Sequence, residues 1–182
     1  MLILVGASAS GKTEIAKRLG ALYGIKKVVT HTSRLPRKGE VNHIDYHFVS
    51  PEEFLALKKE DAFVETTYYN GNYYGCSKKE IAKNKVVVVD PNGLASFLAL
   101  HDPSIIAITL VCDEKVRFHR MKGRGDEEDS IIQRIATDKV DFSNPILKRA
   151  DFTIDTSKDS IESLTNRIYD LYQSEYEKRI GD

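Results

Sequence analysis

The chain has 182 residues, and its 27 Lys and Arg residues balance its 27 Asp and Glu residues, so the formal net charge is zero. This length suits one domain with inserted subdomains, and a composition of 41% hydrophobic and 30% charged residues argues against a disordered chain. Zero net charge disfavours nucleic-acid and membrane-surface binding, and two cysteines favour a reducing cytoplasm over a disulfide framework, so we expect a cytoplasmic protein with neither of those partners.

Short strand-like runs alternate with amphipathic helical patterns along most of the chain. The apolar and β-branched runs are 2–5, 26–30, 85–89 and 105–111. Apolar residues recur at helical spacing in 14–23 and again in 161–171. This alternation predicts an α/β protein, with a parallel sheet covered by helices on both faces.

A glycine-rich motif follows the first predicted strand directly. It has the form G-x-x-x-x-G-K-[ST], and its residues are Gly6, Ala7, Ser8, Ala9, Ser10, Gly11, Lys12 and Thr13. Small residues let backbone amides surround a phosphate, and the helix that follows adds the positive end of its dipole. We expect all eight residues to bind the phosphates of a nucleoside triphosphate, with Lys12 at the β- and γ-phosphates and Thr13 on Mg²⁺. The motif predicts nucleotide binding without naming the reaction.

The run 85–90 has two interpretations. It is an apolar strand that ends in a carboxylate, which is the form of a Walker B element near the metal or the acceptor. Asp90 also begins the sequence Asp-Pro-Asn-Gly, which is typical of a turn or a helix N-cap.

Two stretches interrupt the strand and helix alternation. Residues 31–77 are rich in aromatics and turns: Asn70-Gly71 predicts a hairpin turn, and Ser50 with Glu53 predicts a capping box. We expect a small, mostly antiparallel insertion there. The charged, glycine-containing stretch 122–130 predicts a mobile surface loop.

The insertion begins with a basic loop. Arg34 and Arg37 lie three apart around Pro36, and guanidinium forks suit bidentate contact with a phosphate. Taken alone, the same loop fits a solvated basic surface better than a phosphate site.

Several longer segments of the chain resemble those of the guanylate kinase family. Residues 32–40 and 45–50 are similar to the segment with which that family binds its nucleoside monophosphate. Residues 63–65 and 71–75 resemble its next two elements, and 121–134 resembles its lid. Together with the phosphate loop, the resemblance covers nearly the whole chain. It implies a P-loop core of 1–30 and 85–182, a GMP-binding subdomain of 31–84 and a lid of 122–134.

The resemblance also implies the reaction and its participants. The γ-phosphoryl group would pass directly, in line, from MgATP to GMP or dGMP, with no phosphoenzyme, in a monomer or homodimer. The implied GMP site is Thr30, Arg34, Arg37, Glu40, Tyr46, Glu65, Tyr74, Cys76 and Asp90. The implied catalytic residues are Lys12, Arg34, Arg120, Arg124 and Arg134, of which the last three match lid arginines of the family.

The implied roles make chemical sense. Arg34, Arg37 and the two tyrosines would hold the GMP phosphate. Glu65 would accept from guanine N1–H and the amino group, two donors that adenine lacks on that edge. Arg120 and Arg124 are four apart, so they share a helix face if the helix extends that far.

Four departures from the family pattern leave other acceptors open. Cys76 stands where a hydroxyl is usual, Val88 where an Asp is common and His43 where a glycine is usual, and the lid is about one residue short. The Asn42-His43 pair is similar to a relative of this fold that phosphorylates ribose 1,5-bisphosphate. A non-catalytic guanylate-kinase-like domain that binds phosphopeptides is a third hypothesis, although such domains usually lack the intact phosphate loop found here.

Overall fold

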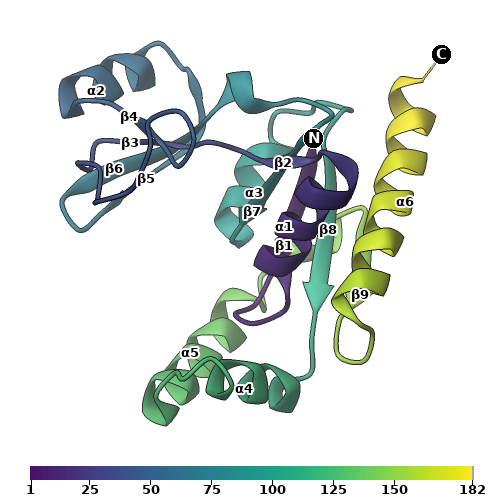
Figure 1. The fold of residues 1–182 in the computed structure, drawn as a ribbon. Helices are drawn as coiled ribbons and strands as arrows, with labels where there is room; N and C mark the ends of the chain where they lie inside the picture. Colours follow the sequence, from purple (N-terminus) through teal and green to yellow (C-terminus); the bar gives the residue numbers. More distant parts are fainter. Residues whose placement is uncertain (182) are drawn as a thin grey trace.

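Five parallel strands form the central sheet, in the order β2-β7-β1-β8-β9. The computed structural model describes residues 1–181. The strands are β1 (Leu2–Gly6), β2 (Lys26–Lys27), β7 (Lys85–Val89), β8 (Ile106–Val111) and β9 (Phe152–Asp155). All four pairings are parallel, as predicted. The predicted strand 26–30 is shorter in the structure, because after Lys27 the chain leaves the sheet edge for a second sheet (Figure 1).

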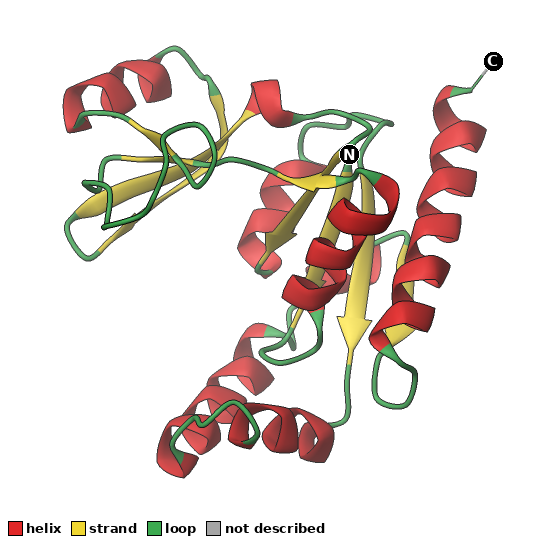
Figure 2. Cartoon of the chain, viewed as in Figure 1, coloured by secondary structure: helices red, strands yellow, loops and turns green. Residues whose placement is uncertain are grey.

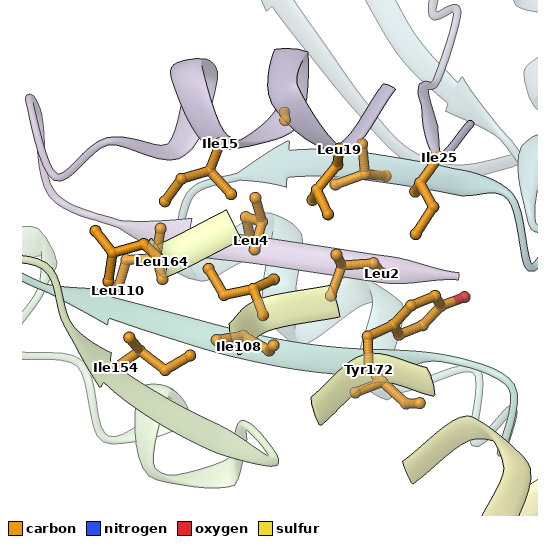
Figure 3. Close-up of a cluster of buried hydrophobic side chains, with 14 residues drawn as sticks. Leu2, Leu4, Ile15, Leu19, Ile25, Ile108, Leu110, Ile154, Leu164 and Tyr172 are labelled. Atoms are coloured by element: carbon orange, nitrogen blue, oxygen red, sulfur yellow. The ribbon is translucent and has the colours of Figure 1, made fainter. Parts of the chain in front are cut away.

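Helices cover both faces of this sheet. Helices α1 (Lys12–Tyr23) and α6 (Ile161–Ile180) pack on one face, in a cluster that includes Leu4, Ile15 and Leu164 (Figure 3). Helix α3 (Pro91–Leu98) packs on the other face, where Ile3 and Val5 meet Leu94 and Phe97. Successive strand residues point to opposite faces, so a strand buried on both faces is apolar throughout.

The second sheet has four short strands in the order β4-β3-β6-β5. They are β3 (His31–Thr32), β4 (His47–Phe48), β5 (Phe63–Tyr69) and β6 (Asn72–Ser77). Only β3 and β4 are parallel, so the prediction of a mostly antiparallel insertion is confirmed. Asn70 and Gly71 have positive φ at the hairpin turn. Helix α2 (Pro51–Lys59) begins at the predicted capping box, and its Phe54 stacks on Phe63.

Two segments join the second sheet to the core: residues 28–30, and residues 78–84 with the short helix η1 (Lys78–Glu80). The Glu80 carboxylate ties them together. It accepts from the Val29 amide at 3.2 Å and from Lys85 Nζ at 2.8 Å. Burial alone would raise the pKa of Glu80, but these hydrogen bonds outweigh it, and the pKa is lowered.

The region predicted as a lid, 122–134, consists of the end of one helix, a short turn and the first half of the next helix. Helix α4 (Glu114–Lys122) and helix α5 (Glu128–Asp141) lie together at one end of the core (Figures 1 and 2), and residues 123–127 connect them. The loop expected at 122–130 is therefore shorter. Because α4 ends at Lys122, Arg124 lies beyond it and does not share a helix face with Arg120. The short helix η2 (Pro145–Arg149) then leads into β9.

None of the helices in residues 1–181 is long and apolar enough to cross a membrane.

Candidate functional site

The phosphate loop, residues 6–13, depends on backbone shapes that glycine permits. A Cβ atom at Gly6 would collide with the Leu110 carbonyl oxygen. Ala9 and Gly11 have φ of 58° and 98°. Left-handed residues that alternate with ordinary ones turn successive amides toward one concavity, which is the form of an anion-binding nest.

Three consecutive carbonyls of this loop each accept a hydrogen bond from a distant side chain. Arg117 Nη1 donates to Ser8 O at 3.3 Å and Arg120 Nη1 to Ala9 O at 3.1 Å. The hydroxyl of Thr156, a residue just after β9, donates to Ser10 O at 2.9 Å. In a trans peptide the carbonyl and the following N–H point in opposite directions. Holding the carbonyls outward therefore turns the following amide groups toward the inside of the loop.

A fourth side chain, Asp138, contacts the loop from α5. Its carboxylate accepts from the Ser8 amide at 3.0 Å and from the Ser8 hydroxyl at 3.2 Å, and it forms an ion pair with Arg117 at 2.6 Å. Sequence reasoning missed Arg117, Asp138 and Thr156. A signal for Asp138 was present, because it continues the helical spacing of the buried Ile131 and Ile135, where an apolar residue is expected.

Lys12 is folded into the loop that it would use to bind phosphate. Its ammonium group donates to the carbonyls of Gly6 and Ala7. Burial lowers the pKa of Lys12 to about 8; Asp138 opposes the shift, while Arg117 and Arg124 add to it. A phosphate that enters the loop would favour the charged form of Lys12 and so raise its pKa again.

The residues around Thr13 suit a magnesium ion that arrives with a nucleotide. Thr13 lies in the first turn of α1 and is exposed, and Val88 offers no oxygen ligand. Asp90 is the N-cap of α3, accepting from the Gly93 amide at 2.7 Å, as one interpretation of its sequence predicted. Among residues 1–181, no three His, Cys, Asp or Glu side chains form a metal-binding group. Mg²⁺ usually keeps several waters and binds substrate phosphates, so one threonine hydroxyl fits it.

The second sheet gathers a cation and two phenols. The Arg34 guanidinium lies 5.4 Å from the centre of the Tyr46 ring, and the Tyr46 and Tyr74 rings meet edge to face at 6.3 Å. Arg34 also forms an ion pair with Glu40 at 2.8 Å, and Glu40 accepts from the Arg37 amide at 2.7 Å. Hydrogen bonds from Arg34 and from that amide lower the pKa of Glu40. Arg37 is exposed.

Glu65 and Cys76 lie directly opposite each other on β5 and β6. Burial raises the pKa of the Glu65 carboxyl, and the charge of Asp90 adds to the effect. Cys76 is fully buried, and burial raises the pKa of its thiol to about 12, so the thiol stays protonated. Thr30 is half-buried in the segment that leads into the second sheet.

The three predicted lid arginines have different surroundings. Arg120 is half-buried and, besides Ala9 O, it donates to Thr156 O at 2.7 Å and to Cys112 Sγ at 3.3 Å. Arg124 is exposed in the turn after α4. Arg134 is exposed on α5 and forms an ion pair with Asp126 at 3.1 Å. Only Arg120 therefore contacts the phosphate loop in this structure.

Asn42 and His43, the pair that suggested a sugar-phosphate acceptor, both contact the neighbouring strand β4. Asn42 Oδ1 accepts from the Phe48 amide at 3.0 Å. His43 has positive φ, and its Nδ1 lies 2.8 Å from Nδ1 of His47.

Comparisons with known proteins identify relatives of this chain. The sequence profile of the family described as "Guanylate kinase" matches residues 1–175. A guanylate kinase of Neisseria gonorrhoeae is 36% identical over 141 residues, 74% of this chain and 69% of that protein. One of Schizosaccharomyces pombe is 34% identical over 162 residues, 78% of this chain and 76% of that protein. The crystal structure of guanylate kinase from Anaplasma phagocytophilum, 24% identical, has a TM-score of 0.67 and covers 99% of this chain and 86% of that one, which supports the fold.

Proposed function

Because the chain belongs to the guanylate kinase family and is a nucleotide kinase of that family, we propose that it phosphorylates GMP and dGMP with MgATP. The observation that carries the acceptor is the group of Arg34, Tyr46 and Tyr74, with Glu65 on the same sheet. A guanidinium fork and two phenols suit a phosphate, and a carboxylate suits the two adjacent donors of guanine.

The proposed parts follow from this assignment. Residues 31–84 form the acceptor subdomain, residues 1–30 and 85–182 the core, and residues 122–134 the lid. In the acceptor subdomain, Arg37 and Glu40 help to hold the phosphate end of GMP, and Thr30 and Cys76 lie at the base. Asp90 lies at the edge of the core that faces Glu65, where its charge influences that carboxyl.

The proposed transfer is direct and in line. An oxygen of the GMP phosphate attacks the γ-phosphorus, a new P–O bond forms, and the bond to the β-phosphate oxygen breaks to release ADP. Loop amides and Lys12 bind the ATP phosphates, and Arg120, Arg124 and Arg134 neutralise charge as the lid closes and excludes water. Mg²⁺, held by Thr13 and phosphate oxygens, would supply further charge neutralisation.

A coupled assay of ADP release from MgATP tests the acceptor. We expect turnover with GMP and dGMP, and little with AMP, UMP or ribose 1,5-bisphosphate. Turnover with ribose 1,5-bisphosphate alone would favour the sugar-phosphate hypothesis, which the contacts of Asn42 and His43 with strand β4 do not support. No turnover with any acceptor, together with tight phosphopeptide binding, would favour the phosphopeptide hypothesis.

A further inference from the structure

The ion pair between Arg117 on α4 and Asp138 on α5 connects both helices that flank the lid turn to the phosphate loop. The two side chains are only 7% and 9% exposed, and Arg117 Nη1 lies 2.6 Å from Asp138 Oδ2. Between them they bind every polar group of Ser8: its carbonyl, its amide and its hydroxyl. One loop residue is thus held entirely by the two helices.

Stability alone gives a poor reason for this pair. Buried ion pairs lose so much solvation that apolar residues of similar volume often replace them without loss of stability. Asp138 also shares its face of α5 with Ile131 and Ile135, so a leucine there would continue the buried apolar stripe. The contacts to Ser8 are what an apolar pair could not supply.

Those contacts act on the part of the loop that would meet a nucleotide. Arg117 holds the Ser8 carbonyl outward, which directs the Ala9 amide inward. Arg117 also compensates the Asp138 carboxylate, which would otherwise place an unpaired negative charge beside a site for phosphates. A cavity of about 240 Å³, lined in part by Ala7, Arg117 and Asp138, lies beside the pair, so the loop has room to shift if these contacts are lost.

We infer that Arg117 and Asp138 are positioning residues for ATP binding: they hold the phosphate loop in its anion-binding shape. Through them, that shape depends on the placement of α4 and α5, the two helices that flank the lid turn. The inference rests on the proposed function only in taking ATP as the nucleotide bound by the loop. Neither residue needs to touch ATP for this role.

The decisive variant is the double substitution R117L/D138L, which keeps a buried apolar contact between α4 and α5 but removes every contact to Ser8. We expect it to fold, with a Tm within about 5 °C of the parent protein. We expect its Kd for MgATP, measured by calorimetry, to rise ten-fold or more, while the Kd for GMP changes less than two-fold. The single variant R117L, if it folds, should bind MgATP more weakly than the double variant, because its Asp138 charge is unpaired.

A second ion pair between the same helices provides the matched control. Lys139 Nζ on α5 lies 2.9 Å from Glu114 Oε2 on α4, but both side chains are exposed and this ion pair joins only the two helices. The variant E114Q/K139M should leave the MgATP and GMP Kd values and the Tm nearly unchanged.

The outcomes separate the inference from the proposed function. If R117L/D138L folds and binds MgATP as tightly as the parent protein, the inference is wrong, whatever the acceptor. An equal loss of MgATP and GMP affinity would also overturn it, because that result indicates general damage to the fold. If the parent protein binds MgATP but does not phosphorylate GMP, the proposed acceptor fails while the ATP measurements still test the inference.

Discussion

The two proposed phosphate-binding regions of this protein differ in how far their side chains are arranged before a substrate binds. The phosphate loop has three consecutive carbonyls held by side chains from other elements, together with a buried ion pair at Ser8. The cluster of Arg34, Tyr46 and Tyr74 at the second sheet is only half-buried, and its Arg34 already forms an ion pair with Glu40. The phosphate loop, proposed to bind the phosphate donor ATP, is therefore preorganised. At the cluster proposed to bind the acceptor GMP, a phosphate must share Arg34 with Glu40.

The largest expected effect comes from removing the cation of the preorganised region. Lys12→Met should lower kcat/KM by about 100-fold or more, since it removes a charge aimed at the transferring phosphate. It should also keep or raise the Tm, because burial makes the charged form of Lys12 unfavourable in the folded protein. Lys17→Met, on the exposed side of the same helix, is the control. If Lys12→Met keeps full activity, Lys12 has no role in the reaction.

The next effect concerns the acceptor side. Glu65→Gln should lower kcat/KM for GMP by about ten-fold or more, since a neutral amide presents one acceptor where the base offers two donors. The KM for ATP should hold within about two-fold, because the change lies on the second sheet. The exposed Glu60→Gln serves as the matched control, measured in the same steady-state assay. If the KM values for GMP and ATP rise by the same factor, the two substrates do not bind in two separate regions.

A change of pH should act on the donor side first. The pKa of Lys12 is about 8 in the empty protein, so its positive charge is lost as the pH rises through 8. We expect the MgATP affinity measured by calorimetry to fall about ten-fold between pH 7 and pH 9. The fold itself should gain stability between about pH 8 and 10.5, because the unfolded chain binds the Lys12 proton more tightly than the folded one. The MgATP affinity of Lys12→Arg should not change between pH 7 and pH 9. If its affinity still falls, another group is responsible.

The smallest expected effect is at Cys76. Its thiol is buried and protonated, and within residues 1–181 it makes one weak hydrogen bond, to the Ser77 carbonyl at 3.9 Å. Cys76→Ser should leave the KM for GMP unchanged or lower it by up to about three-fold, since a hydroxyl is a better donor than a thiol. Cys76→Ala is the control for packing and should lower the Tm without lowering the KM. A collapse of activity in the serine variant would mean that the thiol has a role in the reaction.

The sequence predicted those elements whose conformation depends on residues close together along the chain. The Asn70-Gly71 turn, the capping box at Ser50 and the glycine-rich loop were all visible in the sequence, because each depends on residues close along the chain. The two interpretations of Asp90 could not be separated by sequence, since both place a carboxylate at the end of a buried strand; the structure shows that it caps α3.

What sequence reasoning missed depends on distant contacts. Thr156 and Asp138 lie more than a hundred residues from the loop that they bind, and neither belongs to a recognisable motif. Arg120 was predicted as a lid residue, yet its surroundings depend on where α4 ends and on how β9 approaches the loop. Contacts of this kind follow from the packing of helices on the sheet, and that packing is not encoded in any short stretch of chain.

The tie at Glu80 has a mechanical consequence. Because one carboxylate joins both segments that connect the second sheet to the core, neither segment can slide along the other without breaking a hydrogen bond. We therefore expect the second sheet to move as a unit about the joint formed by Val29 and Glu80. Such a swing would carry Arg34 and Glu65 along one arc, so the phosphate and the base of a bound acceptor would approach the core in step.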